Sequence, residues 1–169
     1  MRVHVCAVGR LRAGPERQLA DDYYDRFDRT GRPLGLGPLT EHEVEDKKGG
    51  GMAAEADLLA RALPNGALLV TLDERGRVMS SPDFAAMLAK WRDGGRQDVA
   101  FVIGGADGID PVLRARAEAS VSFGAMVWPY AGPGHAGRTA VPRGDHFGWR
   151  AVSQGLTHSV PRVDTFTTH

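Results

Sequence analysis

Short runs of strand length, several of them wholly apolar, alternate along the chain with stretches of helical periodicity. The clearest runs are residues 3–8, 67–72, 99–103 and 121–128. A strand without a polar face must be covered on both sides, and strands that alternate with helices are typical of a parallel sheet. The sequence therefore predicts an α/β fold, with a largely parallel sheet and helices on both faces. The order of the strands stays open.

Boundary residues sharpen the predicted helices. A helix is expected from Pro15, and a second one begins at Met52. Ser81 and Asp110 each stand directly before a proline, so each combines a capping side chain with a proline at the first helical position. Both are expected to start helices. Residues 34–44 form a weaker strand candidate, because two glycines and a proline interrupt them.

Composition excludes several classes of protein. The 169 residues suit one compact domain, and their formal net charge of zero argues against binding to nucleic acid by bulk charge, although a local basic patch stays possible. No apolar run approaches the roughly 20 residues that span a bilayer. The single cysteine, Cys6, lies in a predicted buried strand and is interpreted as a core residue. We expect a cytoplasmic protein without a metal, because no ligand set has metal-site spacing.

Three segments lie at or around the carboxyl ends of predicted strands, which is where open α/β sheets bind ligands. They are residues 71–73, 104–108 and 123–129. Glycines in such a position let a ligand approach the main chain, but their spacing fits neither the dinucleotide nor the ATP phosphate pattern. Asp73 and Asp107 are candidate acids or bases, although solvated turn residues are the favoured interpretation. His4 is interpreted as a strand residue without a catalytic role.

Four motifs stand out along the chain: VCAVG at residues 5–9, TLDERG at 71–76, FVIGGADG at 101–108 and SFGAMVWP at 122–129. In this order and at these distances, they resemble the RlmH family of the SPOUT superfamily of methyltransferases, and the resemblance covers residues 1–129. It implies a trefoil-knotted α/β fold, S-adenosyl-L-methionine as methyl donor, and methylation at N3 of a pseudouridine in large-subunit ribosomal RNA. It also implies a homodimer whose active site forms at the subunit boundary.

The resemblance also implies which residues bind the donor, largely through main-chain groups. They are Leu72, Gly104, Phe123, Gly124, Ala125, Met126, Val127 and Trp128. Such a donor needs little acid–base help, because placing the nucleophilic nitrogen in line with the methyl group matters more. No catalytic residue is assigned, since the family's catalytic tail residues have no counterpart in this chain.

The resemblance ends after Pro129. The family continues with a long apolar helix that passes through the knot, whereas residues 130–169 contain six glycines and three prolines, with Leu156 as the one Leu, Ile or Met. Such a segment cannot supply an amphipathic helix. We therefore expect a methyltransferase domain at 1–129, incomplete without its knot-forming helix, and an unrelated irregular or disordered tail at 130–169.

A change of reading frame explains this tail. When the segment from Tyr130 is back-translated with allowed codons and read one base later, it gives MLARVMLAEQLYR and then AATILAGAPYH, which resemble the family's last helix and tail. The match is constrained, because the first base of each shifted codon is the middle base of an encoded one. We expect a frame change at the Pro129 codon, and a chain of low stability, poor dimerisation and weak activity.

Two alternatives differ from a methyltransferase. One is a non-catalytic RNA- or ribosome-binding module that keeps the fold. The other treats the tail, which is rich in arginine and histidine, as an evolved RNA- or metal-binding arm. The frame change explains the same tail residues without selection, so this second alternative ranks last.

Overall fold

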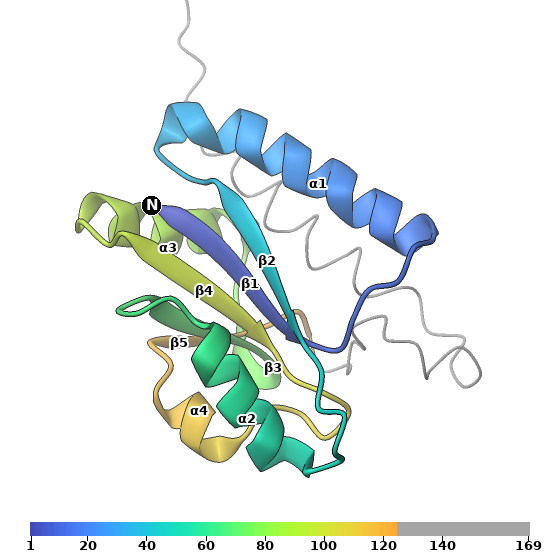
Figure 1. Cartoon of the computed structure of the whole chain (residues 1–169). Coiled ribbons are helices and arrows are strands. Elements are labelled where there is room, and N and C mark those ends of the chain that lie inside the picture. Colours follow the sequence, from blue (N-terminus) through green and yellow to red (C-terminus); the bar gives the residue numbers. More distant parts are fainter. Residues whose placement is uncertain (125–169) are drawn as a thin grey trace, which may run out of the picture.

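A parallel five-stranded sheet organises the protein. The structure is a computed structural model that describes residues 1–124. Its strands are β1 (Arg2–Val8), β2 (Leu39–Val44), β3 (Leu68–Val78), β4 (Asp98–Ile103) and β5 (Ala119–Ser122). They lie in the order β2-β1-β4-β3-β5, and every neighbouring pair is parallel (Figure 1). The predicted fold class is confirmed, and the structure supplies the strand order.

Helices alternate with the strands along the chain and pack against the sheet. They are α1 (Pro15–Gly31), α2 (Gly51–Ala62), α3 (Ser81–Asp93) and α4 (Pro111–Ala115), with a short 3-10 helix, η1, at Arg32–Leu34. In Figure 1, α1 and α3 lie towards one end of the picture and α2 and α4 towards the other. Parallel neighbours need such crossover connections, because a tight turn cannot return the chain to the same end of the sheet.

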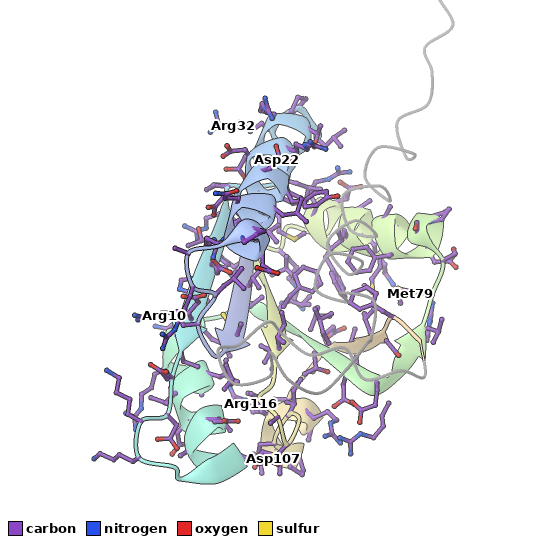
Figure 2. All side chains as sticks on the ribbon, turned by 90° about the vertical axis from the view of Figure 1, so that its right-hand side faces the viewer. Arg10, Asp22, Arg32, Met79, Asp107 and Arg116 are labelled. Atoms are coloured by element: carbon purple, nitrogen blue, oxygen red, sulfur yellow. The ribbon has the colours of Figure 1, made fainter. Side chains whose placement is uncertain are left out.

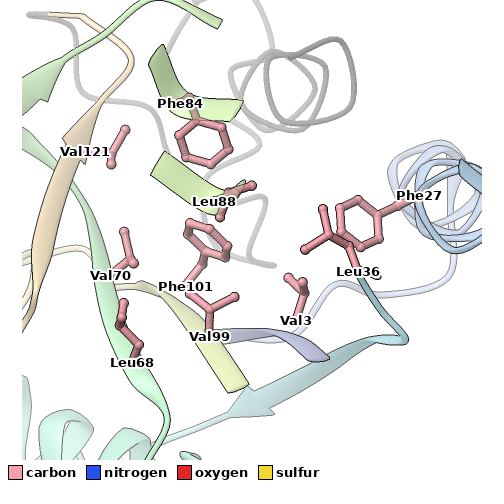
Figure 3. Packing of buried hydrophobic residues seen from close by; sticks show 10 residues of the cluster. All are labelled: Val3, Phe27, Leu36, Leu68, Val70, Phe84, Leu88, Val99, Phe101 and Val121. Carbon is pink, nitrogen blue, oxygen red and sulfur yellow. The ribbon is translucent and has the colours of Figure 1, made fainter. Parts of the chain in front are cut away.

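Two apolar clusters hold the layers together. The larger one joins side chains of the sheet to α1, α3 and the segment before β2 (Figure 3): Val3, Phe27, Leu36, Leu68, Val70, Phe84, Leu88, Val99, Phe101 and Val121. The smaller one joins the sheet to α2 and α4: Cys6, Leu59, Leu69, Ala100, Val102, Ile109 and Leu113. Alternate side chains of a strand point to opposite faces, so the wholly apolar strands feed both clusters.

Cys6 belongs to the smaller cluster and is completely buried. Burial raises the pKa of its thiol to about 12, because a thiolate would lose its hydration there. A thiol in this state is a poor nucleophile. Cys6 is therefore the core residue that the sequence indicates.

Three predicted boundaries differ from the observed ones. The weak candidate at 34–44 is a strand only from Leu39, and the strand predicted at 121–128 runs from Ala119 to Ser122. The cap of α3 is Ser80, whose side chain accepts a hydrogen bond from the amide of Asp83, so the cap lies one residue earlier than expected. Asp110 caps α4 as predicted, through the amide of Val112.

Strand β3 is interrupted where it leaves the core. Leu72 and Arg77 both pair with Val121 of β5, so the residues between them bulge out of the sheet. Gly76 makes this return possible, because a Cβ at that position would lie 2.7 Å from the carbonyl carbons of Ser120 and Val121. The bulge places Asp73 and Arg75 beside the end of the neighbouring strand.

Several predictions lie outside the described residues. These are the knot, the domain boundary at 129, the character of residues 130–169, and the placement of Ala125, Met126, Val127 and Trp128. They stay predictions.

Candidate functional site

The three predicted strand ends meet at one edge of the sheet. Strand β3 lies between β4 and β5, and Leu72 pairs with Ile103 on one side and with Val121 on the other. Because the strands are parallel, Gly104 and Phe123 follow at the same edge, one and two residues after these partners. Leu72, Gly104, Phe123 and Gly124 are each partly exposed, whereas the strand residues before them are mostly buried.

The glycine loop after β4 closes on itself. Gly105 and Gly108 form an isolated bridge, in which the Gly108 amide donates to the Gly105 carbonyl over 3.0 Å. A Cβ at Gly104 would overlap the Gly108 carbonyl and lie 2.8 Å from Cγ1 of Ile109. Gly108 has a φ of +88°, which side-chain-bearing residues rarely adopt. The loop therefore requires glycine at both ends.

Glu55 of α2 lies over this loop. A Cβ at Gly105 would lie 2.6 and 2.7 Å from its two carboxylate oxygens, so the missing side chain leaves room for the carboxylate. Burial and the nearby charges of Asp107 and Asp46 raise the pKa of Glu55. No local sequence signal marks Glu55, because its neighbour at the loop lies fifty residues further along the chain.

Asp73 corrects the sequence-based interpretation. Its side chain is only 1% exposed, so it is not a solvated turn residue. Its Oδ1 accepts hydrogen bonds from the Arg75 amide at 2.9 Å and from Arg75 Nε at 3.1 Å. Its Oδ2 lies 3.1 Å from Nε of Arg114, a charge contact without hydrogen-bond geometry. Asp107, in contrast, is exposed at the surface of the loop, as expected.

The charge of Asp73 is stabilised inside the protein. Burial by itself would raise its pKa, but the hydrogen bonds from Arg75 and the charges of Arg114 and Arg75 outweigh burial and hold the pKa below the usual value. A carboxylate with a lowered pKa stays ionised at neutral pH. Asp73 is therefore a fixed negative charge and a poor proton donor.

The end of β5 turns sharply towards the same edge. The Ser122 hydroxyl donates to the Gly124 carbonyl at 2.8 Å and accepts from the Gly124 amide at 3.1 Å. Gly124 has a φ of +130°, which favours glycine. Phe123 and Gly124 thus lie directly after β5 at this edge, and the four predicted donor-binding residues that follow them lie outside the described part.

Residues at the other end of the sheet do not join this site. His4 lies at the amino end of β1, where Nε2 is 2.8 Å from Oδ1 of Asp98 and Nδ1 is 3.2 Å from Nε2 of His42. These residues are packed against one another, far along the strands from the glycine loop. His4 is thus a strand residue, as interpreted from the sequence.

The site edge is built from loops rather than from metal ligands. Figure 2 shows Asp107 and Arg116 towards the end of the molecule that carries the glycine loop and α4, and Arg32 at the opposite end. Within residues 1–124, no three His, Cys, Asp or Glu side chains gather as a metal ion would need. No helix in that range is long and apolar enough to cross a membrane. Main-chain groups and glycines dominate this end of the sheet. Such groups can bind a ligand through hydrogen bonds to its polar atoms.

Comparisons with known proteins point in one direction. Residues 1–131 match a family model described as "Predicted SPOUT methyltransferase". The protein named ribosomal RNA large subunit methyltransferase H from Ruegeria sp. (strain TM1040) is 74% identical over 130 residues, which cover 77% of this chain and 83% of that relative. Its namesake from Dinoroseobacter shibae is 68% identical over the same shares of both chains.

A solved structure is also similar, more distantly. The SpoU methyltransferase AviRb from Streptomyces viridochromogenes, in complex with the cofactor AdoMet, shares 16% identity with a TM-score of 0.36. The match covers 93% of this chain and 57% of that one. A likeness at this level does not establish a common fold.

Proposed function

The chain belongs to the SPOUT methyltransferase family, and on that premise we propose that it methylates large-subunit ribosomal RNA with S-adenosyl-L-methionine as donor. The acceptor in this proposal is N3 of a pseudouridine. One observation carries it most directly: the matched segment contains every described element and all three strand ends that meet at the candidate site. The relatives that share this segment are named as ribosomal RNA methyltransferases.

The residues at this edge fit a donor held through main-chain groups. Leu72, Gly104, Phe123 and Gly124 are partly exposed side by side, and we assign them to the donor site together with residues 125–128. When bound, S-adenosylmethionine supplies a methyl group activated by its sulfonium. The protein's task is to hold that methyl group in line with the acceptor nitrogen and to exclude water.

The proposal includes a homodimer that acts in the cytoplasm. In this proposal the active site is completed at the boundary between the two subunits, as the resemblance to the family implies. The family model's match ends at residue 131, near the point at which the reading-frame hypothesis places the change. Resequencing the gene across the Pro129 codon tests that hypothesis, and an uninterrupted frame that is confirmed in the DNA and shared by close relatives would contradict it.

Tritium transfer from labelled donor to ribosomes tests the proposed activity. Two chains are compared: the encoded chain, and a frame-restored chain in which residues 130–169 are replaced by the shifted-frame segment. We expect the restored chain to label large-subunit RNA, and the encoded chain to label it weakly or not at all. Digestion of the labelled RNA to nucleosides then identifies the modified base.

Co-sedimentation with ribosomes separates the proposal from a binding module. A restored chain that sediments with ribosomes but transfers no label would contradict the methyltransferase activity and favour the non-catalytic module. Label in a base other than pseudouridine would contradict the acceptor but keep the reaction class.

A further inference from the structure

Arg114 connects two of the three strand ends of the candidate site. It lies in α4, on the segment that leads from the glycine loop to β5. Its Nε is 3.1 Å from Oδ2 of Asp73, the residue directly after Leu72. Its Nη2 donates to the carbonyl of Ile109 over 2.8 Å, and Ile109 directly follows the glycine loop. One guanidinium thus reaches both the end of β3 and the end of the loop.

We infer that Arg114, held by Asp73, is a positioning residue that sets the glycine loop in the conformation that binds the donor. This inference rests on the proposed function. The guanidinium is planar and rigid, so the charge contact of its Nε with Asp73 restricts where Nη2 can lie as it donates to the Ile109 carbonyl. The position of the Ile109 carbonyl, and with it that of the Gly108 end of the loop, then depends on a residue of β3.

The surroundings of Asp73 restrict the movement of its contact with Arg114. Its side chain is 1% exposed and that of Arg114 is 27% exposed, so the contact lies largely away from water. Arg75 binds the other carboxylate oxygen through its amide and its Nε. A buried carboxylate that loses one partner leaves an uncompensated charge, so its position resists change. Asp73 therefore serves as a fixed anchor for Arg114.

Ile109 links the position of Arg114 to the conformation of the glycine loop. Its side chain is buried in the cluster beneath α2 and α4, and its Cγ1 occupies the space beside Gly104 that a Cβ would need. Gly108, its neighbour, closes the loop through the bond to the Gly105 carbonyl. A shift of the Ile109 main chain would therefore move both glycines of the proposed donor contact.

A lysine at position 114 separates positioning from simple stabilisation. Lysine can still place a positive charge near Asp73, but its single ammonium lacks the second, rigidly directed donor for the Ile109 carbonyl. The test uses the full 169-residue chain with Arg114→Lys, Arg114→Met and the control Arg116→Lys. Arg116 is exposed directly after α4, and Arg116→Lys replaces arginine by lysine as Arg114→Lys does.

Two readouts are measured on these variants. Hydrogen exchange followed by mass spectrometry compares the peptide spanning 104–109 with the peptide spanning β1. Calorimetry measures the affinity for S-adenosylmethionine and for S-adenosylhomocysteine. For Arg114→Lys we expect exchange in the loop peptide to rise about tenfold and affinity for both ligands to fall about tenfold, as for one lost hydrogen bond. Exchange in β1 and the melting temperature should stay unchanged, as they should throughout in Arg116→Lys.

The outcomes distinguish this inference from the proposed function. If Arg114→Lys exchanges and binds like the unaltered chain, or if its exchange rises equally in the loop and in β1, Arg114 does not position the loop. If the unaltered chain binds neither ligand, as the altered tail would predict, the exchange comparison alone decides whether Arg114 holds the loop, and label transfer with the frame-restored chain decides the proposed function separately. Arg114→Met should show the larger change in both readouts, together with a lower melting temperature.

Discussion

The two ends of the sheet each bury an aspartate, and they use it differently. At the amino end, Asp98 accepts hydrogen bonds from Nε and Nη2 of Arg2 at 2.7 and 2.6 Å, and from His4 at 2.8 Å. At the carboxyl end, Asp73 is bonded to Arg75 through one oxygen, and its other oxygen has a charge contact without hydrogen-bond geometry. The amino end satisfies both oxygens of its aspartate with hydrogen bonds, while the carboxyl end leaves one oxygen of its aspartate with a charge contact only.

Other buried polar atoms follow the same division. Among the described residues, four buried side-chain atoms have no hydrogen-bond partner: Thr71 Oγ1, Asp73 Oδ2, Arg114 Nε and Ser120 Oγ. All four belong to β3, α4 or β5, the elements around the candidate site, and Thr71 pairs with Ser120 across the strands. Unsatisfied buried groups cost free energy, and such costs concentrate at sites shaped for binding. We therefore propose that the amino end contributes mainly to stability and the carboxyl end to donor binding.

Replacing Asp98 should have the largest effect on stability. In Asp98→Ala, the buried His4 ring loses its acceptor, and we expect the free energy of unfolding to fall by about 3 kcal/mol. Urea denaturation monitored by circular dichroism measures the change. The control is Asp93→Ala, because Asp93 is 66% exposed and pairs with Arg92 at the surface, where such pairs contribute little. Equal effects of the two substitutions would contradict the division between the ends.

Replacing Gly104 should reduce binding as well as stability. In Gly104→Ala, the added methyl group overlaps the Gly108 carbonyl, so the loop must shift, at a cost of about 2 kcal/mol. Calorimetry with S-adenosylmethionine should show affinity lost beyond detection, while urea denaturation measures the stability. Gly14→Ala is the control, because a Cβ at Gly14 would lie 3.5 Å from its nearest neighbour, Oε2 of Glu16, and its φ of 167° is extended backbone that any residue adopts. Retained donor affinity in Gly104→Ala would remove Gly104 from the site.

The helix cap at Ser80 should contribute to the stability of the protein without affecting its affinity for the donor. Ser80 accepts the Asp83 amide at 3.3 Å, so Ser80→Ala should cost about 1 kcal/mol. Ser81→Ala, at the position expected from the sequence, should cost less. Thermal denaturation compares the two variants. A larger cost at Ser81 would mean that the cap is where the sequence predicted it.

The smallest expected effect is the pH dependence of stability. It arises from His42, beside His4 at the amino end of the sheet. Burial and the nearby His4 lower the pKa of His42. Since the folded protein then binds the proton less readily than the unfolded chain, stability is full above the unfolded pKa of about 6.5 and falls as pH drops through the lower folded pKa. His42→Gln should flatten the profile in that window. The groups that face His42 are His4 on β1 and, through His4, Asp98 on β4.

Asp98 acts at a lower pH than His42. Hydrogen bonds from Arg2 hold its pKa below the usual value despite burial, with further contributions from His4. Its stabilisation is present above the unfolded pKa of about 3.9 and is lost as pH falls through the folded value. Urea denaturation at a series of pH values separates the two windows. A loss of stability near pH 6 that persists in His42→Gln would contradict the assignment to His42.

Local patterns predicted the elements well, because helix and strand periodicity and capping depend on residues close in the chain. The strand ends carrying Leu72, Gly104 and Phe123 could also be identified this way. Boundaries were less accurate where a long-range contact decided them: β3 extends past Leu72 because Gly76 lets the chain return to β5, which no local pattern reveals.

By itself, the sequence determined the α/β class, the parallel strands, the core role of Cys6 and the three loops proposed to bind the donor. Only the tertiary structure decided the strand order, the burial of Asp73 and the contact of Arg114 with Ile109. It also decided the bond between His4 and Asp98, which are 94 residues apart. The physical reason is that periodicity records which face of an element is apolar, whereas the environment of a charged side chain depends on which distant residues the strand order brings beside it.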